Sequence, residues 1–161
     1  MLISLGKKPR AVFVPDAEAL AAAAADFVRR MKSKEKLELQ DIVILTVSTL
    51  EKSVLAGVTS LAGIPLAHQP AEGKVWFTTV RRYKGLEAKA VLLVDVHVSK
   101  LVKPTCQRLV YVGSSRASAY LETIFLSDVS AEEYPALVEQ LDTAIEPFPQ
   151  GVAKWLGMEA Q

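Results

Sequence analysis

The sequence has few of the residues that build disulfides and metal clusters. Its 161 residues include one cysteine, Cys106, and two histidines, His68 and His97. A single cysteine excludes an internal disulfide and a thiolate metal cluster, and two histidines are too few for a histidine metal site. We therefore expect no structural zinc.

Long apolar runs are also missing. No run approaches the roughly 20 residues that a membrane span needs, and the apolar part of the N-terminal segment MLISLGKKPR is too short for a secretory signal. We expect a cytoplasmic protein that does not contact a membrane. Because 50% of the residues are hydrophobic and 23% are charged, we predict a single globular domain over residues 1–161.

The charges are unevenly distributed along the chain, although the net charge is only +1. Residues 74–118 contain nine Lys or Arg against two Asp or Glu, whereas residues 119–161 contain one against eight. This asymmetry suggests an anionic partner for the middle segment. The alternative is that the two segments balance each other on the folded surface.

The hydrophobic pattern predicts strands that alternate with helices. Continuous apolar runs predict buried central strands at 41–47, 75–80 and 90–96, with further strands at 11–15, 64–69 and 120–126. Helices are expected over 17–33 with Asp16 as N-cap, over 48–63, after Pro104 with Thr105 as cap, and in an acidic tail over 128–161. The alternation predicts an α/β fold, a mainly parallel sheet with flanking helices.

Cationic residues gather where the predicted strand 75–80 ends. Arg81, Arg82 and Lys84 follow the strand directly, and ligands of parallel α/β sheets bind at the carboxyl ends of the strands. Gly85 would allow the backbone to approach a ligand, and a chain that entered a helix there would offer free amides to an anion. We predict a phosphate-binding turn, in which Glu87 either accepts a hydrogen bond from a sugar hydroxyl or lies in the first turn of a helix.

Two segments resemble the motifs of a known family. TVRRYKGLEAKAVLLVDV, followed by RLVYVGSSRASAYL, resembles the last two motifs of UvrD/Rep-type superfamily 1 DNA helicases. DIVILTV at 41–47 resembles the strand that carries that family's motif IV. The likeness covers residues 41–127 and implies the second, C-terminal RecA-like domain, a fold related to P-loop NTPases, which faces both ATP and single-stranded DNA.

The resemblance implies roles for individual residues. Glu87 would hold the nucleotide ribose, and Lys84 and Gly85 would line the nucleotide cleft. Arg116 would be the catalytic arginine finger, because a planar and permanently charged donor stabilises the charge on the γ-phosphate during transfer. The alternative for Arg116 is a solvated helix arginine.

The resemblance also places Thr79 and Arg81 on the DNA-backbone side, and there the sequence departs from the family. Arg81 stands where the family has histidine, and Val47 stands where motif IV supplies an arginine to the γ-phosphate. The chain has no Gly-x-x-x-x-Gly-Lys-Ser/Thr segment. Asp95 is followed by valine, so an Asp-Glu Walker B pair is missing too. The chain cannot be a complete helicase.

Two hypotheses remain open. In the first, the chain is the second half of an ATP-dependent DNA helicase or translocase, whose site is completed by an N-terminal RecA-like domain. ATP and Mg²⁺ would then bind only in the complete protein, and the isolated chain would be inactive and would expose an apolar interdomain patch. In the second, it is a degenerate helicase-like module that binds nucleic acid or a protein partner without catalysis, which Val47 favours.

Overall fold

The computed structural model describes residues 9–130, 132 and 159–160. Its strands are β1 (Arg10–Val14), β2 (Ile42–Thr46), β3 (Ser60–Leu61), β4 (Ile64–Ala67), β5 (Val75–Thr79), β6 (Ala88–His97), β7 (Ala117–Leu126) and β8 (Glu159–Ala160). Its helices are α1 (Ala17–Ser33) and α2 (Pro104–Ser114), with 3₁₀ turns η1 (Leu39–Asp41) and η2 (Val98–Lys100).

The strands form one sheet in the order β3, β4, β5, β2, β6, β7, β1, β8. Neighbouring strands run parallel, and only β3 pairs with β4 in the antiparallel sense. The predicted central strands β5, β2 and β6 are confirmed as adjacent parallel strands in the middle of the sheet. All five residues of β2 are buried, because parallel strands of this kind are covered on both faces.

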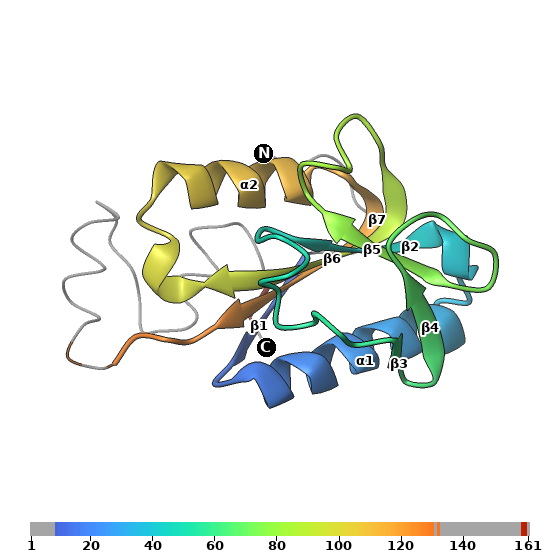
Figure 1. Cartoon of the computed structure of the whole chain (residues 1–161), viewed down its shortest axis with the longest axis horizontal. Helices are drawn as coiled ribbons and strands as arrows, with labels where there is room; N and C mark the ends of the chain where they lie inside the picture. Colours follow the sequence, from blue (N-terminus) through green and yellow to red (C-terminus); the bar gives the residue numbers. More distant parts are fainter. Residues whose placement is uncertain (1–8, 131, 133–158, 161) are drawn as a thin grey trace.

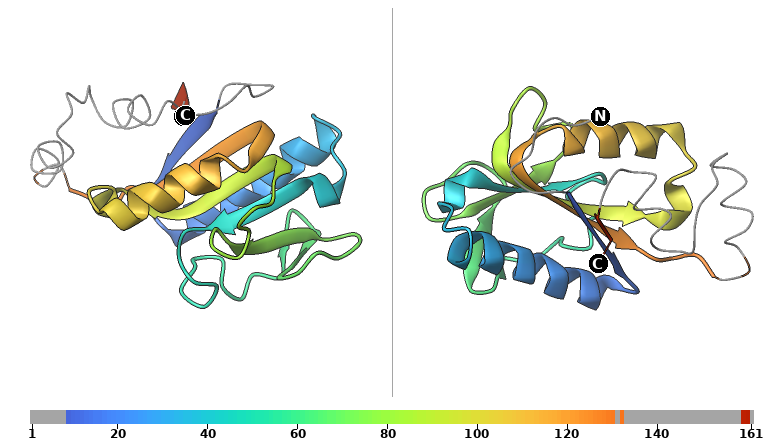
Figure 2. Two further views of the ribbon diagram at one scale, coloured as in Figure 1. Left: turned by 90° about the horizontal axis from the view of Figure 1, so that it is seen from above. Right: turned by 180° about the vertical axis from the view of Figure 1, so that it is seen from behind.

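One helix covers each face of the sheet (Figures 1 and 2). The core on the α1 side is centred on Leu20, Phe27 and Ile44, and the core on the α2 side is centred on Leu93 and Val110. The helix predicted over 17–33 is confirmed, and its cap is Asp16, whose Oδ1 accepts a hydrogen bond of 2.8 Å from the amide of Ala19.

Helix α2 packs very closely on β6. A Cβ atom added to Gly113 would lie 2.5 Å from Leu93 Cδ2 and 3.2 Å from Val80 Cγ2, so the last turn of the helix needs a residue without a side chain. The predicted cap of this helix is wrong. Lys103 occupies the N-cap position without a side-chain hydrogen bond, and Pro104 opens the helix, because proline lacks the amide that a cap would satisfy.

The helix predicted over 48–63 is also wrong. This segment is a series of turns that leads into β3, and Gly57 within it has φ of 82°. The Ser53 hydroxyl and the Val54 amide donate to the carboxylate of Asp95 at 2.5 and 2.8 Å, and Leu55 is fully buried. These tertiary contacts satisfy groups that a helix would have paired locally.

The predicted acidic helix of the tail lies outside the described residues, except for the short strand β8 and a few residues after β7. Among the residues that the structure describes, no helix has the length and apolar character to cross a membrane.

Candidate functional site

The segment that joins β5 to β6 runs from the side of the sheet where the parallel strands end, here called the carboxyl edge, to the side where they begin, here called the amino edge. Both strands run parallel to β2, which lies between them, so residues 80–87 must lead from the carboxyl end of β5 to the amino end of β6. Val80 and Tyr83 anchor this crossover in the core on the α2 side, and Tyr83 contacts Trp76 edge-on at 5.1 Å between ring centroids. The crossover therefore carries Arg81 at the carboxyl edge and Glu87 at the amino edge.

No helix begins at Gly85. The chain passes through turns and enters β6 directly, so helix amides for an anion, and a place for Glu87 in a helix first turn, are not present there. Gly85 has φ of 81°, a left-handed conformation that favours glycine. The sequence suggested a glycine needed for close approach to a ligand, and the structure shows that the turn itself requires it.

At the amino edge, Glu87 lies beside Arg116. Ala88 pairs with Ala117 on the neighbouring strand, and the Ala88 amide donates to the Arg116 carbonyl at 2.9 Å. The pKa of the Tyr83 phenol is raised by burial and by the charge of Glu87, while the charge of Arg116 opposes that rise. The negative charge of Glu87 and the positive charge of Arg116 therefore both act on the Tyr83 phenol, and they shift its pKa in opposite directions.

Arg116 lies in the turn after α2 rather than within the helix. Its side chain is half-buried, and its Nε is buried without a hydrogen-bond partner among the described residues. Buried donors of this kind are uncommon in folded proteins and call for a partner. A solvated helix arginine is thus not what the structure shows. Lys84, Gly85 and Glu87 are exposed.

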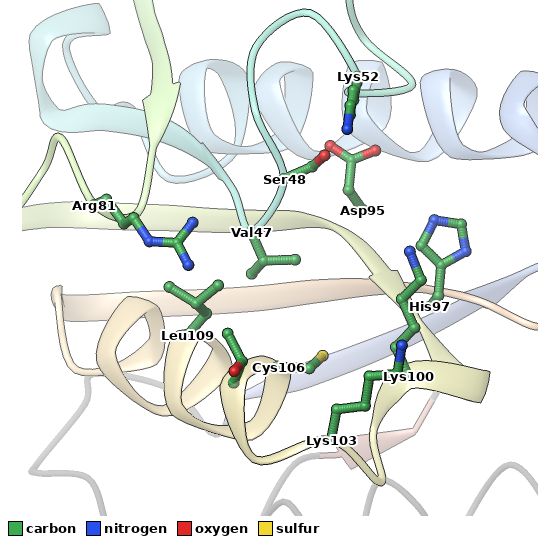
Figure 3. Close-up of a pocket in the computed structure, with 11 residues that line it drawn as sticks. Val47, Ser48, Lys52, Arg81, Asp95, His97, Lys100, Lys103, Cys106 and Leu109 are labelled. Atoms are coloured by element: carbon green, nitrogen blue, oxygen red, sulfur yellow. The ribbon is translucent and has the colours of Figure 1, made fainter.

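At the carboxyl edge, Arg81 is exposed at a cavity of about 320 Å³ (Figure 3). Thr79, which the resemblance places on the DNA-backbone side together with Arg81, lies at the end of β5. Its Oγ1 accepts a hydrogen bond of 3.1 Å from the Arg82 amide, so the hydroxyl already holds the turn in place. The structure brings Thr79 and Arg81 to one edge and separates them from Glu87 and Arg116, whereas Lys84, whose amide donates to the Arg81 carbonyl at 3.4 Å, lies in the same turn as Arg81.

Three further cations line this cavity and were not predicted as site residues. Lys100 comes from η2, Lys103 precedes α2, and Lys52 comes from the turns after β2. The excess of Lys and Arg over 74–118 was the signal for the first two. Lys52 gave no such signal, because it belonged to a segment that the pattern predicted as a helix.

Asp95 lies at the bottom of the same cavity and is 4% exposed. Its carboxylate accepts hydrogen bonds from Thr46 Oγ1 at 2.5 Å, Ser53 Oγ at 2.5 Å and the Val54 amide at 2.8 Å. Three protein donors take three of the roughly four acceptor positions on its two oxygens, so little capacity remains for a metal ion. In the part of the chain that the structure describes, no cluster of three or more His, Cys, Asp or Glu could hold one.

Two large hydrophobic side chains are exposed among the described residues. They are Leu86 and Tyr111, at 46% and 55% exposure, and both belong to the segments with motif resemblance. The expected interdomain patch remains a prediction, since two side chains do not define a patch.

Comparisons with known proteins support the resemblance drawn from the motifs. Residues 74–122 match the family model of the UvrD-like helicase C-terminal domain. This UvrD-like match begins just before β5 and ends within β7, so it contains the crossover, β6, α2 and Arg116. It confirms the resemblance that the two motifs predicted. A comparison with curated proteins finds no match.

The fold is similar to that of a solved protein domain. The structure resembles the C-terminal domain of a possible DNA helicase from Lactobacillus plantarum WCFS1, with a TM-score of 0.62 and 19% sequence identity over 78% of each chain. At this identity the likeness concerns the fold. It confirms the α/β class with a mainly parallel sheet that the sequence predicted.

Proposed function

We propose that this chain is the second RecA-like half of an ATP-dependent DNA helicase or translocase, and that an N-terminal RecA-like domain completes its ATP site. The UvrD-like match and the helicase-like fold support the class. The observation that carries the proposal is the crossover 80–87, because it separates Thr79 and Arg81 from Glu87 and Arg116, at opposite edges of the sheet.

The group at the amino edge fits a nucleotide. Glu87 is exposed and can accept hydrogen bonds from ribose hydroxyls, while Lys84 and Gly85 line the approach. Arg116 is half-buried at the same edge and its Nε has no partner among the described residues, so its guanidinium is held at this edge and can donate to a γ-phosphate from its outer nitrogens. Arg116 would stabilise the charge that develops on that phosphate, a contribution of about 10³ to 10⁵ in rate for arginine fingers.

The remaining parts of the ATP site must come from the other domain. The described residues offer no phosphate-cradling Gly-x-x-x-x-Gly-Lys loop, and the oxygens of Asp95 are occupied by three protein donors. Mg²⁺ and the β-phosphate therefore need ligands from the N-terminal domain.

The group at the carboxyl edge fits the backbone of single-stranded DNA. Arg81 is exposed there and carries a permanent charge in place of the family's histidine, and Thr79 positions the turn that presents it. Contacts of this kind bind phosphates irrespective of base sequence.

Val47 favours a second candidate, a module that binds nucleic acid or a protein partner without catalysis. It lines the cavity at the carboxyl edge, and an apolar side chain at this position cannot supply the phosphate contact that motif IV makes in the family.

Hydrolysis and DNA binding by the complete protein distinguish the two candidates. We expect Arg116→Ala to slow ATP hydrolysis by about 10³-fold or more, and to leave single-stranded DNA binding nearly unchanged, because the loss is confined to the transition state. Arg81→Ala should instead weaken binding to every DNA sequence alike. Lys32→Ala, which removes an exposed cation from α1, is the matched control. If the Arg116 variant hydrolyses ATP at the wild-type rate, the non-catalytic module replaces the helicase assignment.

A further inference from the structure

We propose that the cavity at the carboxyl edge is a second phosphate-binding subsite for the single strand, in which Lys100 and Lys103 hold the strand opposite Arg81. This inference rests on the proposed function and extends it to residues outside the helicase motifs. The single-stranded DNA would cross the carboxyl ends of β2 and β6, with one phosphate at Arg81 and a following phosphate at Lys100 and Lys103.

Among the described residues, the cationic side chains that line the cavity outnumber its one carboxylate, that of Asp95. Four cations line it, namely Lys52, Arg81, Lys100 and Lys103. No ion pair among the described residues involves any of the four. Lys52, Arg81, Lys100 and Lys103 are also exposed, so their charges are available to a ligand.

The acidic groups near the cavity are already engaged. Asp95 is buried beneath three hydrogen-bond donors. Asp128, next to the rim, accepts hydrogen bonds from the amide and hydroxyl of Ser99 at 2.9 and 2.6 Å, and lies 3.1 Å from His97 Nδ1. Both carboxylates accept hydrogen bonds that hold loops in place, and Asp95, which lines the cavity, is 4% exposed.

The arrangement of the lining fits a polynucleotide backbone. Figure 3 shows Arg81 on one side of the cavity and Lys100 with Lys103 on the other, with Val47 and Leu109 between them. Single-stranded DNA has the same alternation of charged and less polar groups, because charged phosphates flank a sugar and base that tolerate apolar contact. Val47 thus contributes to an apolar floor between two cationic ends, which accounts for a valine at this place.

Single-stranded DNA fits this cavity better than a free nucleotide does. Recognition of a ribose uses a free carboxylate as acceptor, and the carboxylate that lines this cavity, Asp95, has its oxygens occupied. The free carboxylate of Glu87 lies at the opposite edge of the sheet. The N-terminal end of α2, which carries Thr105 into the lining, adds a favourable field for phosphate.

The salt dependence of binding tests the proposal quantitatively. Binding of fluorescein-labelled oligothymidylate to the full chain is measured by anisotropy over a range of salt concentrations. Each phosphate contact contributes about 0.7 to the slope of log K against log salt for a single strand. Because the two lysines hold one phosphate, we expect Lys100→Gln with Lys103→Gln to reduce the slope by about 0.7, and Lys32→Gln, on α1, to leave it unchanged.

The single cysteine gives an independent measurement without any mutation. Cys106 is half-buried and lines the cavity, and it is the only thiol in the chain. Saturating oligothymidylate should therefore slow its alkylation by iodoacetamide several-fold, whereas ATP at the same phosphate concentration should have little effect.

The outcomes separate this inference from the proposed function. If Arg81→Ala weakens binding while the double lysine variant keeps the wild-type slope, or if bound oligothymidylate leaves the alkylation rate of Cys106 unchanged, the subsite is refuted and the proposed function stands. If ATP protects Cys106 and the lysine variants lose ATP affinity, the cavity is a nucleotide site and the inference is wrong. If the wild-type chain does not bind oligothymidylate at all, the proposed DNA contact fails first.

Discussion

At the scale of single residues, Asp95 shows how a motif-like carboxylate can serve structure. It has φ of 67°, a conformation that aspartate and asparagine tolerate better than most residues. Its hydrogen bonds join the end of β2, through Thr46, to the turns that carry Ser53 and Val54. The sequence indicated only that Asp95 ends an apolar strand without the glutamate of a Walker B pair, whereas the structure shows the residue that fixes the loop beside the cavity.

Substitution of Asp95 tests this role. We expect Asp95→Ala to lower the free energy of unfolding by about 3 kcal/mol, because it removes hydrogen bonds to a buried charge and leaves their donors unpaired. Asp95→Asn should cost about 1 kcal/mol, since the amide oxygen can still accept from Val54 and the hydroxyls can rotate to accept. Urea denaturation of the two variants measures both values. Equal losses in the two variants would show that the hydrogen bonds at this site do not govern stability.

At the scale of elements, α1 is fixed to the sheet by a buried ion pair as well as by its apolar face. Glu122 on β7 has a side chain that is 3% exposed, and both of its oxygens accept from Arg30 Nη2, at 2.9 and 3.0 Å. Arg10 on β1 lies 3.4 Å away. Burial raises the pKa of Glu122, and the charges of Arg30 and Arg10 offset part of that rise.

The ion pair predicts a pH-dependent loss of stability in Arg30→Ala. Without Arg30, the pKa of Glu122 in the folded state should rise further above its unfolded value of about 4.5, so stability is lost as the pH rises through the folded pKa. The loss should reach about 3 to 5 kcal/mol at neutral pH, typical of a buried charge left unpaired, and should be smaller near pH 4.5.

Thermal or urea unfolding of Arg30→Ala at the two pH values measures the difference. Arg29→Ala is the matched control, because Arg29 is exposed and, among the described residues, forms an ion pair with Asp26 alone. Arg29→Ala should lower the free energy of unfolding only slightly at either pH. A loss in Arg30→Ala that does not depend on pH would indicate lost packing of the side chain rather than an unpaired carboxylate.

At the scale of the whole molecule, the two proposed ligand groups lie at opposite edges of one sheet, and only the amino-edge group would face a second domain. We predict that the isolated chain has no measurable ATPase activity and weak nucleotide affinity, because the phosphate loop and the Mg²⁺ ligands are not in it. Phosphate release by the isolated chain, with and without single-stranded DNA, measures this. Turnover that Arg116→Ala abolishes would refute the assignment to a half-site.

The sequence by itself determined the local elements and the identity of the motif residues. The buried runs that became β2, β5 and β6, the helix capped by Asp16, and the segments containing Glu87 and Arg116 all follow from short-range patterns. Hydrophobic periodicity and caps act within a few residues, so the residues that decide them are adjacent in the chain. The α/β class followed from the same patterns.

Only the tertiary structure decided which residues meet. The turns over 48–59 form because Asp95, more than 40 positions later, accepts hydrogen bonds from Ser53 and Val54, an interaction that outweighs local helix propensity. The separation of Arg81 from Glu87 depends on β5 and β6 running in the same direction in the sheet, and the relative direction of two strands is not encoded in any short segment. Lys52, Lys100 and Lys103 line one cavity for the same reason: long-range packing brings together the ends of elements that are distant in sequence.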